Sequence, residues 1–191
     1  MPNILAVDAT GDVLSVALNG VELKSAAKKA DEALLPLVER LLKKAKLGWK
    51  DLDAVAAASG PGRFTGIRIG MSFASAAGFQ LKIPALAISR LAAAAARSKA
   101  DRVLGALPGW KDEVYSQAFT KGKAKGTASW TAPKDWPALR AAAEKSGLDV
   151  SYGATTAKDL LPVASALLAA KKLPPFKPFY LKPASYERPR G

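Results

Sequence analysis

The chain of 191 residues contains neither histidine nor cysteine, and these two absences exclude several kinds of site. Without histidine there is no imidazole general base, no Ser-His-Asp triad and no imidazole ligand for a metal. Without cysteine there is no thiolate nucleophile, no disulfide and no zinc or iron–sulfur site built on sulfur. Chemistry in this chain would have to use carboxylates, hydroxyls, amines, guanidinium groups, backbone amides or a hard metal held by oxygen.

Acidic residues are scarce, since 16 Asp and Glu stand against 29 Lys and Arg and leave a formal net charge of +13. So basic a chain favours contact with something acidic, such as RNA. The basic residues are nevertheless spread along the chain, without an arginine-rich block or an RNA-binding fingerprint. Trp110 and Tyr115 could stack on a base, although aromatic residues of this kind more often belong to a core. Nucleic-acid binding and a merely solvated basic surface both stay open.

Long apolar runs are missing as well. The run at residues 85–96 is broken by Ser89 and Arg90, and it is shorter than the roughly 20 residues of a membrane span. The first residues show no basic segment followed by an apolar one, so we expect no signal peptide. These features predict a cytoplasmic protein, with no membrane contact, built as one domain or two small lobes.

The opening of the chain is typical of three short strands. Apolar segments at residues 3–8, 13–18 and 21–26 are separated first by Thr10-Gly11-Asp12 and then by Asn19-Gly20. Asn-Gly between apolar runs is a strong hairpin signal, because both residues tolerate a positive φ. The sequence therefore predicts strand, tight loop, strand, hairpin turn and strand.

After these strands the pattern alternates between helices and strands, which is typical of an α/β fold. We predict helices at residues 31–46, 66–80, 89–98, 135–146 and 156–170, with Asp31, Thr65 and Ser89 capping the first three, and strands at 53–59, 83–88, 103–107, 113–120, 121–130 and 149–152. The proline-rich tail should be extended, with residues 178–181 docked on the body. We place a boundary near residue 100, between an N-terminal lobe (1–100) and a smaller C-terminal lobe (101–191).

Asp8 ends the first strand, directly before the tight loop. Actin-like and sugar-kinase-like folds carry an acidic residue and a phosphate-binding hairpin at this point, where a carboxylate can hold Mg²⁺ through water. The alternative is an aspartate that accepts hydrogen bonds from backbone amides and caps the turn. The residues favour this second interpretation, because Ala9 follows Asp8 and the turn contains no lysine.

The Gly60–Gly66 loop, GPGRFTG, is the most specific local feature. It joins a strand to a helix, where backbone amides can hold an anion. It lacks the lysine of a P-loop and the glycine spacing of a dinucleotide loop. Arg63 and Arg68 could pair with a phosphate, but a tight turn that lets the next helix pack closely is the simpler interpretation. Small residues every four positions from Gly66 to Gly78 give that helix a smooth face.

Several segments, in order along the chain, resemble the TsaB (YeaZ) family. The family's opening, its acidic-Leu-Leu-Pro helix, its Gly-Pro-Gly-Ser-Phe-Thr-Gly-Leu-Arg-Ile-Gly signature and two later segments are matched by residues 4–8 with 14–18, 32–38, 60–70, 111–115 and 178–182. The resemblance implies an actin/Hsp70-like ATPase (ribonuclease H-like) fold of class α/β, with two lobes and a reduced second lobe.

The resemblance also implies a function. It predicts a non-catalytic scaffold or activating subunit of the complex that transfers threonylcarbamoyl to the adenosine beside the anticodon of tRNA. The related TsaD would carry the activity as a heterodimer partner, and TsaE, an ATPase, would join them. ATP and a metal are expected in these partners and no cofactor in this chain. Alone, the chain is expected to form a homodimer, and its basic surface could contact tRNA.

Two sets of residues follow from the resemblance. The partner surface would be formed by the first two helices, through Leu34, Leu35, Val38, Gly66, Ile67, Gly70 and Met71. The remains of a nucleotide loop would comprise Asp8, Thr10, Gly60, Gly62, Arg63 and Thr65. The resemblance implies no catalytic residue and no metal site.

The chain departs from the family pattern at three places. The family commonly has His-Ser-Glu where this chain has Ala-Asp-Glu at 30–32, Ser where it has Arg63, and Thr where it has Ala9. The missing histidine agrees with the absence of a metal at that point. Two alternatives stay open: a nucleotide-binding ATPase that uses Asp8 and Thr10, and a peptidase, against which the lack of histidine and cysteine speaks.

Overall fold

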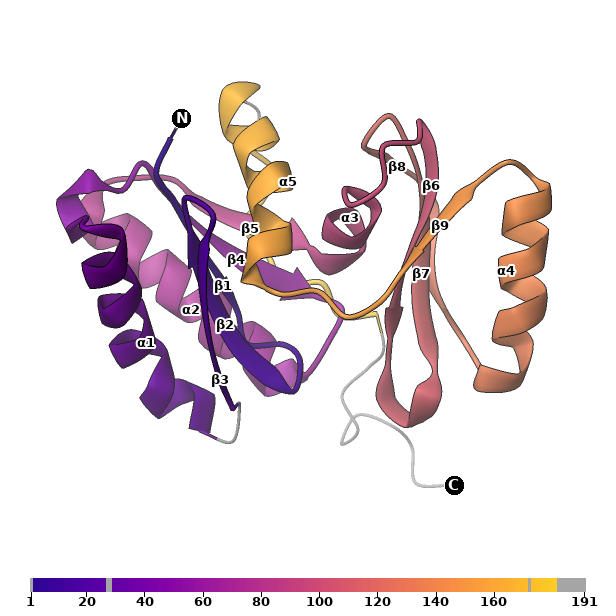
Figure 1. Cartoon of the computed structure of the whole chain (residues 1–191), viewed down its shortest axis with the longest axis horizontal. Coiled ribbons are helices and arrows are strands. Elements are labelled where there is room, and N and C mark those ends of the chain that lie inside the picture. The colour runs from indigo at the N-terminus through magenta and orange to yellow at the C-terminus, as the bar shows by residue number, and fades with distance from the viewer. Residues whose placement is uncertain (1, 27–28, 172, 182–191) are drawn as a thin grey trace.

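The computed structural model describes residues 2–26, 29–171 and 173–181, which fold into two β-sheets with helices packed on them (Figure 1). The first sheet has five strands in the order β3-β2-β1-β4-β5, and the second has four in the order β8-β7-β6-β9. The strands are β1 (Ile4–Asp8), β2 (Val13–Leu18), β3 (Val21–Ala26), β4 (Ala54–Gly60), β5 (Ala85–Ser89), β6 (Arg102–Pro108), β7 (Val114–Thr120), β8 (Lys123–Thr131) and β9 (Asp149–Tyr152). The helices are α1 (Ala30–Ala45), α2 (Phe64–Leu81), α3 (Arg90–Ala95), α4 (Trp136–Lys145) and α5 (Ala157–Ala169), with short 3-10 turns η2 (Trp49–Asp51), η3 (Trp110–Asp112) and η4 (Pro133–Asp135).

β1 lies at the centre of the first sheet, antiparallel to β2 and parallel to β4. Successive side chains of a strand point to opposite faces of the sheet. Leu5 and Val7 therefore pack with α1 and α2, whereas Ile4 and Ala6 pack with α5. Figure 1 shows the resulting layers, with α1 and α2 on one face of the sheet and α5 on the other. Burial on both faces explains why β1 is apolar without alternation.

The elements predicted from the sequence are confirmed, and most of their ends agree to within about two residues. Asn19 and Gly20 both have positive φ and form the predicted hairpin turn between β2 and β3. Ser89 accepts a hydrogen bond from the amide of Ala92 (3.4 Å) and caps α3 as predicted. The helix is shorter than expected, since it ends at Ala95.

Two predicted helix caps are wrong. α1 begins at Ala30, so Asp31 lies in its first turn, and Pro36 lies inside the helix rather than at its start. α2 begins at Phe64, so Thr65 also lies inside the helix. An acidic side chain is favourable anywhere in a first turn because it faces the positive end of the helix dipole. The sequence pattern therefore located the two helix starts but not the capping residues.

The second sheet is covered on one face by α3. Leu91 and Ala95 of this helix pack with Val103, Leu107 and Phe119 of the sheet. From β9 the chain returns to the first sheet, where α5 adds its own apolar side chains to the core that contains β1. The two sheets lie on either side of residue 100, but α5 belongs by packing to the first. The division of the chain into lobes at this residue stays a prediction.

The described part of the tail runs across the body without regular secondary structure. The amide of Phe179 donates a hydrogen bond to the carbonyl of Ser59 (2.7 Å), and the ring of Tyr180 lies 4.9 Å from that of Phe64. The predicted docking of residues 178–181 is therefore confirmed. The rest of the predicted extended tail, residues 182–191, lies outside the described residues.

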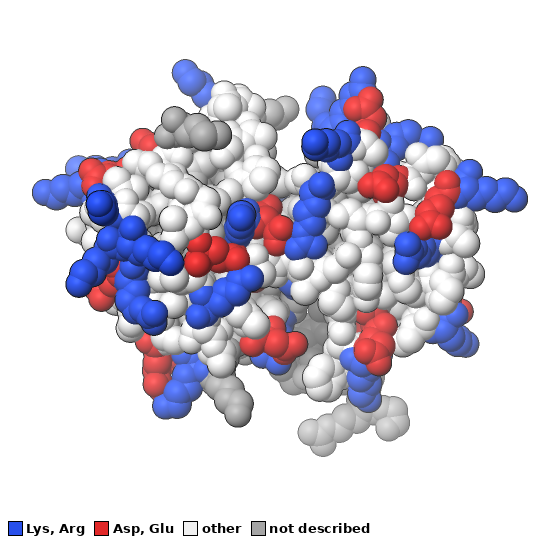
Figure 2. Space-filling view, viewed as in Figure 1, with Lys and Arg blue, Asp and Glu red and all other residues white. Residues whose placement is uncertain are grey.

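Figure 2 shows that lysine and arginine side chains are spread over the visible face of the molecule, with acidic side chains between them. They do not gather into a single stripe on that face. None of the helices in the described ranges is both long and apolar enough to cross a membrane.

Candidate functional site: the cleft between the two sheets

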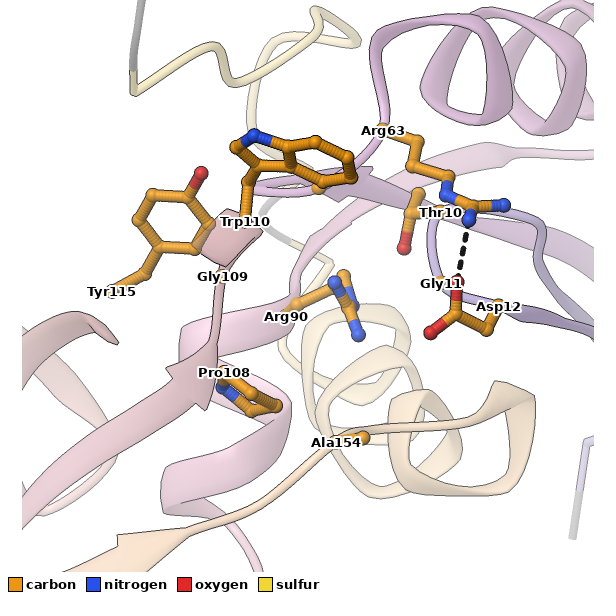
Figure 3. A pocket seen from close by; sticks show the side chains of 11 residues that line it. Thr10, Gly11, Asp12, Arg63, Arg90, Pro108, Gly109, Trp110, Tyr115 and Ala154 are labelled. Carbon is orange, nitrogen blue, oxygen red and sulfur yellow. Dashed lines mark hydrogen bonds and ion pairs between the residues drawn. The ribbon is translucent and has the colours of Figure 1, made fainter. Parts of the chain in front are cut away.

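A pocket of about 310 Å³ opens between the two sheets (Figure 3). The β1–β2 turn, the β4–α2 loop, the start of α3 and the segments after β6 and β9 all contribute to it. Its lining residues are Thr10, Gly11, Asp12, Gly62, Arg63, Arg90, Pro108, Gly109, Trp110, Tyr115 and Ala154. Its volume is at the lower end of the range of small-molecule sites.

The carboxylate of Asp8 lies behind the pocket wall and is buried, with 1% of its surface exposed. Its Oδ1 accepts hydrogen bonds from the amide of Thr10 (2.9 Å) and from the Thr10 hydroxyl (2.5 Å). Its Oδ2 accepts no hydrogen bond from any described residue. Asp8 therefore caps the turn, which confirms the second of the two interpretations of this residue.

Arg90 completes the environment of Asp8. Its Nε lies 3.4 Å from Oδ2 of Asp8 and donates to Oγ1 of Thr155 (2.8 Å), and its Nη1 donates to the carbonyl of Pro61 (2.8 Å). Only 4% of Arg90 is exposed. Arginine is rarely buried without a charged partner, so the two side chains account for each other's burial.

Sequence reasoning missed the function of Arg90. In the sequence, Arg90 stands out only as a break in an apolar run, which argues against a membrane span. A charged residue within a run that is otherwise buried is itself a signal of an internal ion pair. The signal could not identify Asp8 as the partner, since the two residues lie on different elements far apart in the chain.

Arg63 and Asp12 form a second ion pair at the mouth of the pocket, where both side chains are exposed. The amide of Arg63 also donates to the carbonyl of Thr10 (2.9 Å), which ties the GPGRFTG loop to the β1–β2 turn. Among the vestigial-loop candidates, Thr10, Gly62 and Arg63 line the pocket and Asp8 lies behind it, while Gly60 and Thr65 do not line it.

Two glycines of the loop are required by close backbone approach. Gly60 has a φ of +118°, and a Cβ there would meet the carbonyl of Phe179 from the tail. A Cβ on Gly66 would overlap the carbonyl oxygen of Ala9, which follows β1. Glycine tolerates a positive φ and has no Cβ, so it allows both the backbone conformation at Gly60 and the close approach at Gly66. These contacts support the interpretation of the loop as a tight turn that lets α2 approach the sheet.

The predicted partner surface is mostly covered by the chain itself. Six of its seven residues lie on the buried faces of α1 and α2. They are Leu34, Val38, Gly66, Ile67, Gly70 and Met71. Leu35 is the seventh, and 48% of it is exposed. A hollow of about 440 Å³ lies where α1 and α2 begin, lined by residues that include Asp31, Thr65 and Ile69. Direct contact with a partner through these helices stays a prediction, and Leu35 is the member positioned to make it.

A third ion pair, outside the cleft, connects the segment that follows α3 to α5. The guanidinium of Arg97 donates to both carboxylate oxygens of Asp159 (2.9 and 2.7 Å) and to the carbonyl of Ala154 (2.6 Å). Burial raises the pKa of Asp159, but the hydrogen bonds from Arg97 and from the amide of Thr156 outweigh it, so this pKa lies below its ordinary value. The same hydrogen bond raises the pKa of Arg97, against the effect of burial.

No cluster of three or more acidic side chains that could hold a metal ion occurs in the described ranges. The cleft instead carries two carboxylates, on Asp8 and Asp12, and each is paired with an arginine. Its polar groups are thus engaged with one another.

Comparison with known proteins agrees with this geometry. The model of the family described as tRNA N6-adenosine threonylcarbamoyltransferase, TsaD, matches residues 7–131. A crystal structure of a Pseudomonas aeruginosa protein described as similar to peptidase YEAZ superposes with a TM-score of 0.72 at 27% identity, over 95% of this chain and 100% of that one. The fold is therefore that of the actin/Hsp70-like (ribonuclease H-like) class.

Two curated relatives extend the match. The chain is 33% identical over 140 residues to the tRNA threonylcarbamoyladenosine biosynthesis protein TsaB of Buchnera aphidicola subsp. Schizaphis graminum, covering 69% of this chain and 65% of that protein. It is 26% identical over 204 residues to TsaB of Escherichia coli, covering 88% of each. The chain belongs to the TsaB (YeaZ) family, which confirms the resemblance of the motifs. It spans between 56% and 65% of the length of three of the curated TsaB proteins that it matches.

Proposed function

We propose that this chain is a non-catalytic, activating subunit of the complex that transfers threonylcarbamoyl to the adenosine beside the anticodon of tRNA. The observation that carries this proposal is a double similarity. The chain matches the TsaD transferase model over residues 7–131, yet relatives that match it over more of its length are named TsaB. A chain that shares the fold of the transferase but resembles TsaB proteins over more of its length is therefore proposed to act beside the transferase.

The cleft supports the non-catalytic part of the proposal. Asp8 and Thr10 are engaged with each other, and Arg90 supplies the positive charge beside the carboxylate. Thr10 and Arg90 line the cleft, but their polar groups are already hydrogen-bonded within the chain. In the proposed complex TsaD carries out the transfer, TsaE joins it as an ATPase, and the ATP and metal belong to these partners. The reaction acts on tRNA, so the proposed location is the cytoplasm.

The outer face of α1 and α2 is the proposed contact with TsaD, and with a second copy when the chain is alone. Leu35 is exposed on α1, while Ile69 and Phe73 are half-buried on α2. An exposed leucine on one helix and half-buried apolar residues on the other suit a contact that excludes water. Contact with tRNA through the basic surface is a lesser part of the proposal, and it predicts binding that weakens steeply with salt.

The experiment is copurification of the tagged chain with TsaD from the same source, followed by sizing of the complex. We expect a heterodimer whose formation displaces the self-paired form. Calorimetry with TsaD alone and with TsaE alone then separates the two partners. Purified chain that does not bind TsaD, or that transfers threonylcarbamoyl by itself, would contradict the proposal.

A further inference from the structure

The fold class raises a question that the cleft of this chain answers. Proteins of the actin/Hsp70-like class hold a nucleotide and a divalent cation between their lobes, beside a carboxylate at the end of the first strand. Asp8 is that carboxylate here. The residues around it do not fit such a cation. We propose that Arg90 permanently takes the place of the cation and thereby excludes a divalent metal ion and its nucleotide from the cleft.

The two carboxylate oxygens of Asp8 have different surroundings. Mg²⁺ takes oxygen ligands in a nearly ideal octahedron and gives up its waters reluctantly. Oδ1 is occupied by two donors from Thr10, which leaves Oδ2 as the oxygen able to face a cation. Nε of Arg90 lies 3.4 Å from that oxygen. The position beside Oδ2 is therefore filled by a positive charge that belongs to the chain.

The side chain of Arg90 is held in place by further hydrogen bonds. A metal ion could enter if this side chain swung away, but its guanidinium is fixed by Thr155 and by the carbonyl of Pro61. These partners lie on the segment that leads into α5 and on the GPGRFTG loop, so moving Arg90 would break contacts to both. A rotation of Arg90 therefore makes room for a metal ion only at the cost of these contacts.

A nucleotide bound together with a metal would also have to place its phosphates in the cleft. In Figure 3 the guanidinium of Arg90 points toward the turn at Gly11 and Asp12, which would receive them. Its Nη2 lies 3.8 Å from the point that a Cβ on Gly11 would occupy. Asp12 adds an acidic side chain to the same rim, held by Arg63. A divalent ion would meet the positive charge of Arg90, and a nucleotide would then lack the metal ion that holds its phosphates beside Asp8.

The test is thermal unfolding with and without Mn²⁺. The wild type and Arg90→Lys are expected to unfold at a temperature that Mn²⁺ does not change. Arg90→Ala leaves Asp8 without its counter-charge, so we expect a lower unfolding temperature that Mn²⁺ raises. The double variant Asp8→Asn, Arg90→Ala should lose this response. Arg97→Ala is the matched control, because it unpairs Asp159 outside the cleft and should gain no response to Mn²⁺.

Two results would overturn the inference. One is an equal response of Arg90→Ala and the double variant to Mn²⁺. The other comes from calorimetry of the wild type with Mn²⁺ and ATP, which does not depend on the folding of any variant at position 90. Binding heat that disappears in Asp8→Asn would show that the native cleft accepts a metal and nucleotide, whereas no heat supports exclusion. The outcome is independent of whether the chain binds TsaD.

Discussion

At the scale of single residues, the cleft is held together by polar side chains that the sequence could not pair. Arg90 contacts Asp8, Thr155 and the carbonyl of Pro61, which lie on three different segments. A pattern of strands and helices locates each residue on an element, but it contains no information on which distant charges meet. Asp8 was predicted as a turn cap because that contact is local, with a partner two residues away.

The Asp8–Arg90 pair predicts an asymmetry between single and double variants. Arg90→Met leaves a buried carboxylate without a partner and should lower the free energy of unfolding by about 3–5 kcal/mol. The double variant Asp8→Asn, Arg90→Met removes both charges and should lower it by much less. Urea unfolding of the two proteins measures the difference. Equal losses would mean that the two charges do not interact.

The glycines of α2 predict effects of opposite sign. Gly66→Ala places a Cβ against the carbonyl of Ala9 and should destabilise the protein by about 1–3 kcal/mol. Gly70→Ala meets Val7 at 3.8 Å, an ordinary contact, and gains up to about 1 kcal/mol of helix propensity. Thermal or urea unfolding compares them. A destabilised Gly70→Ala beside an unaffected Gly66→Ala would refute the packing described for α2.

At the scale of elements, apolar runs and turn residues predicted the strands and helices, and the exceptions have physical causes. The apolar stripe of α1 identified a helix with one buried face, but α1 is packed so that Leu34 points into the core and Leu35 outward. Neighbouring leucines differ by about 100° around a helix, and the sequence alone does not fix which one a sheet will cover. The return of α5 to the first sheet was also missed, since its apolar face fits either sheet.

The ion pair between Arg97, which follows α3, and Asp159 of α5 predicts how stability depends on pH. Because the folded pKa of Asp159 is lowered, its contribution is present above the pKa of the unfolded chain and is lost as the pH falls through the folded value. The stability difference between wild type and Asp159→Asn should therefore be largest near neutral pH and shrink below about pH 4. Urea unfolding across this range checks the direction. A difference that grows in acid would contradict the pairing with Arg97.

At the scale of the whole molecule, the two-sheet fold brings the signature loop and the β1–β2 turn together at one cleft, and the tail is held against that loop through Phe179. The motifs predicted the family and the fold class, because their order along the chain is specific. They did not predict which of the signature residues are accessible. Gly66 and Ile67 serve the packing of α2, so substitutions there would report on folding before they report on a partner.

Leu35 gives a cleaner test of the proposed partner surface. Leu35→Asp places a charge on an exposed position of α1, so the fold should stay intact while binding to TsaD weakens at least about tenfold. Leu173→Asp, at a residue of similar exposure in the tail, is the matched control and should bind normally. Calorimetric titration with TsaD measures both. Equal affinities would move the contact away from α1.

We propose that this chain supports a transferase without performing the transfer. The most direct measurement is the amount of threonylcarbamoyladenosine formed on tRNA when threonylcarbamoyl-AMP and ATP are supplied to TsaD and TsaE, with and without this chain. We predict no product from the chain alone, little from TsaD and TsaE, and full formation when all three are combined. Product from the chain alone, or formation by TsaD and TsaE that this chain does not increase, would contradict the account.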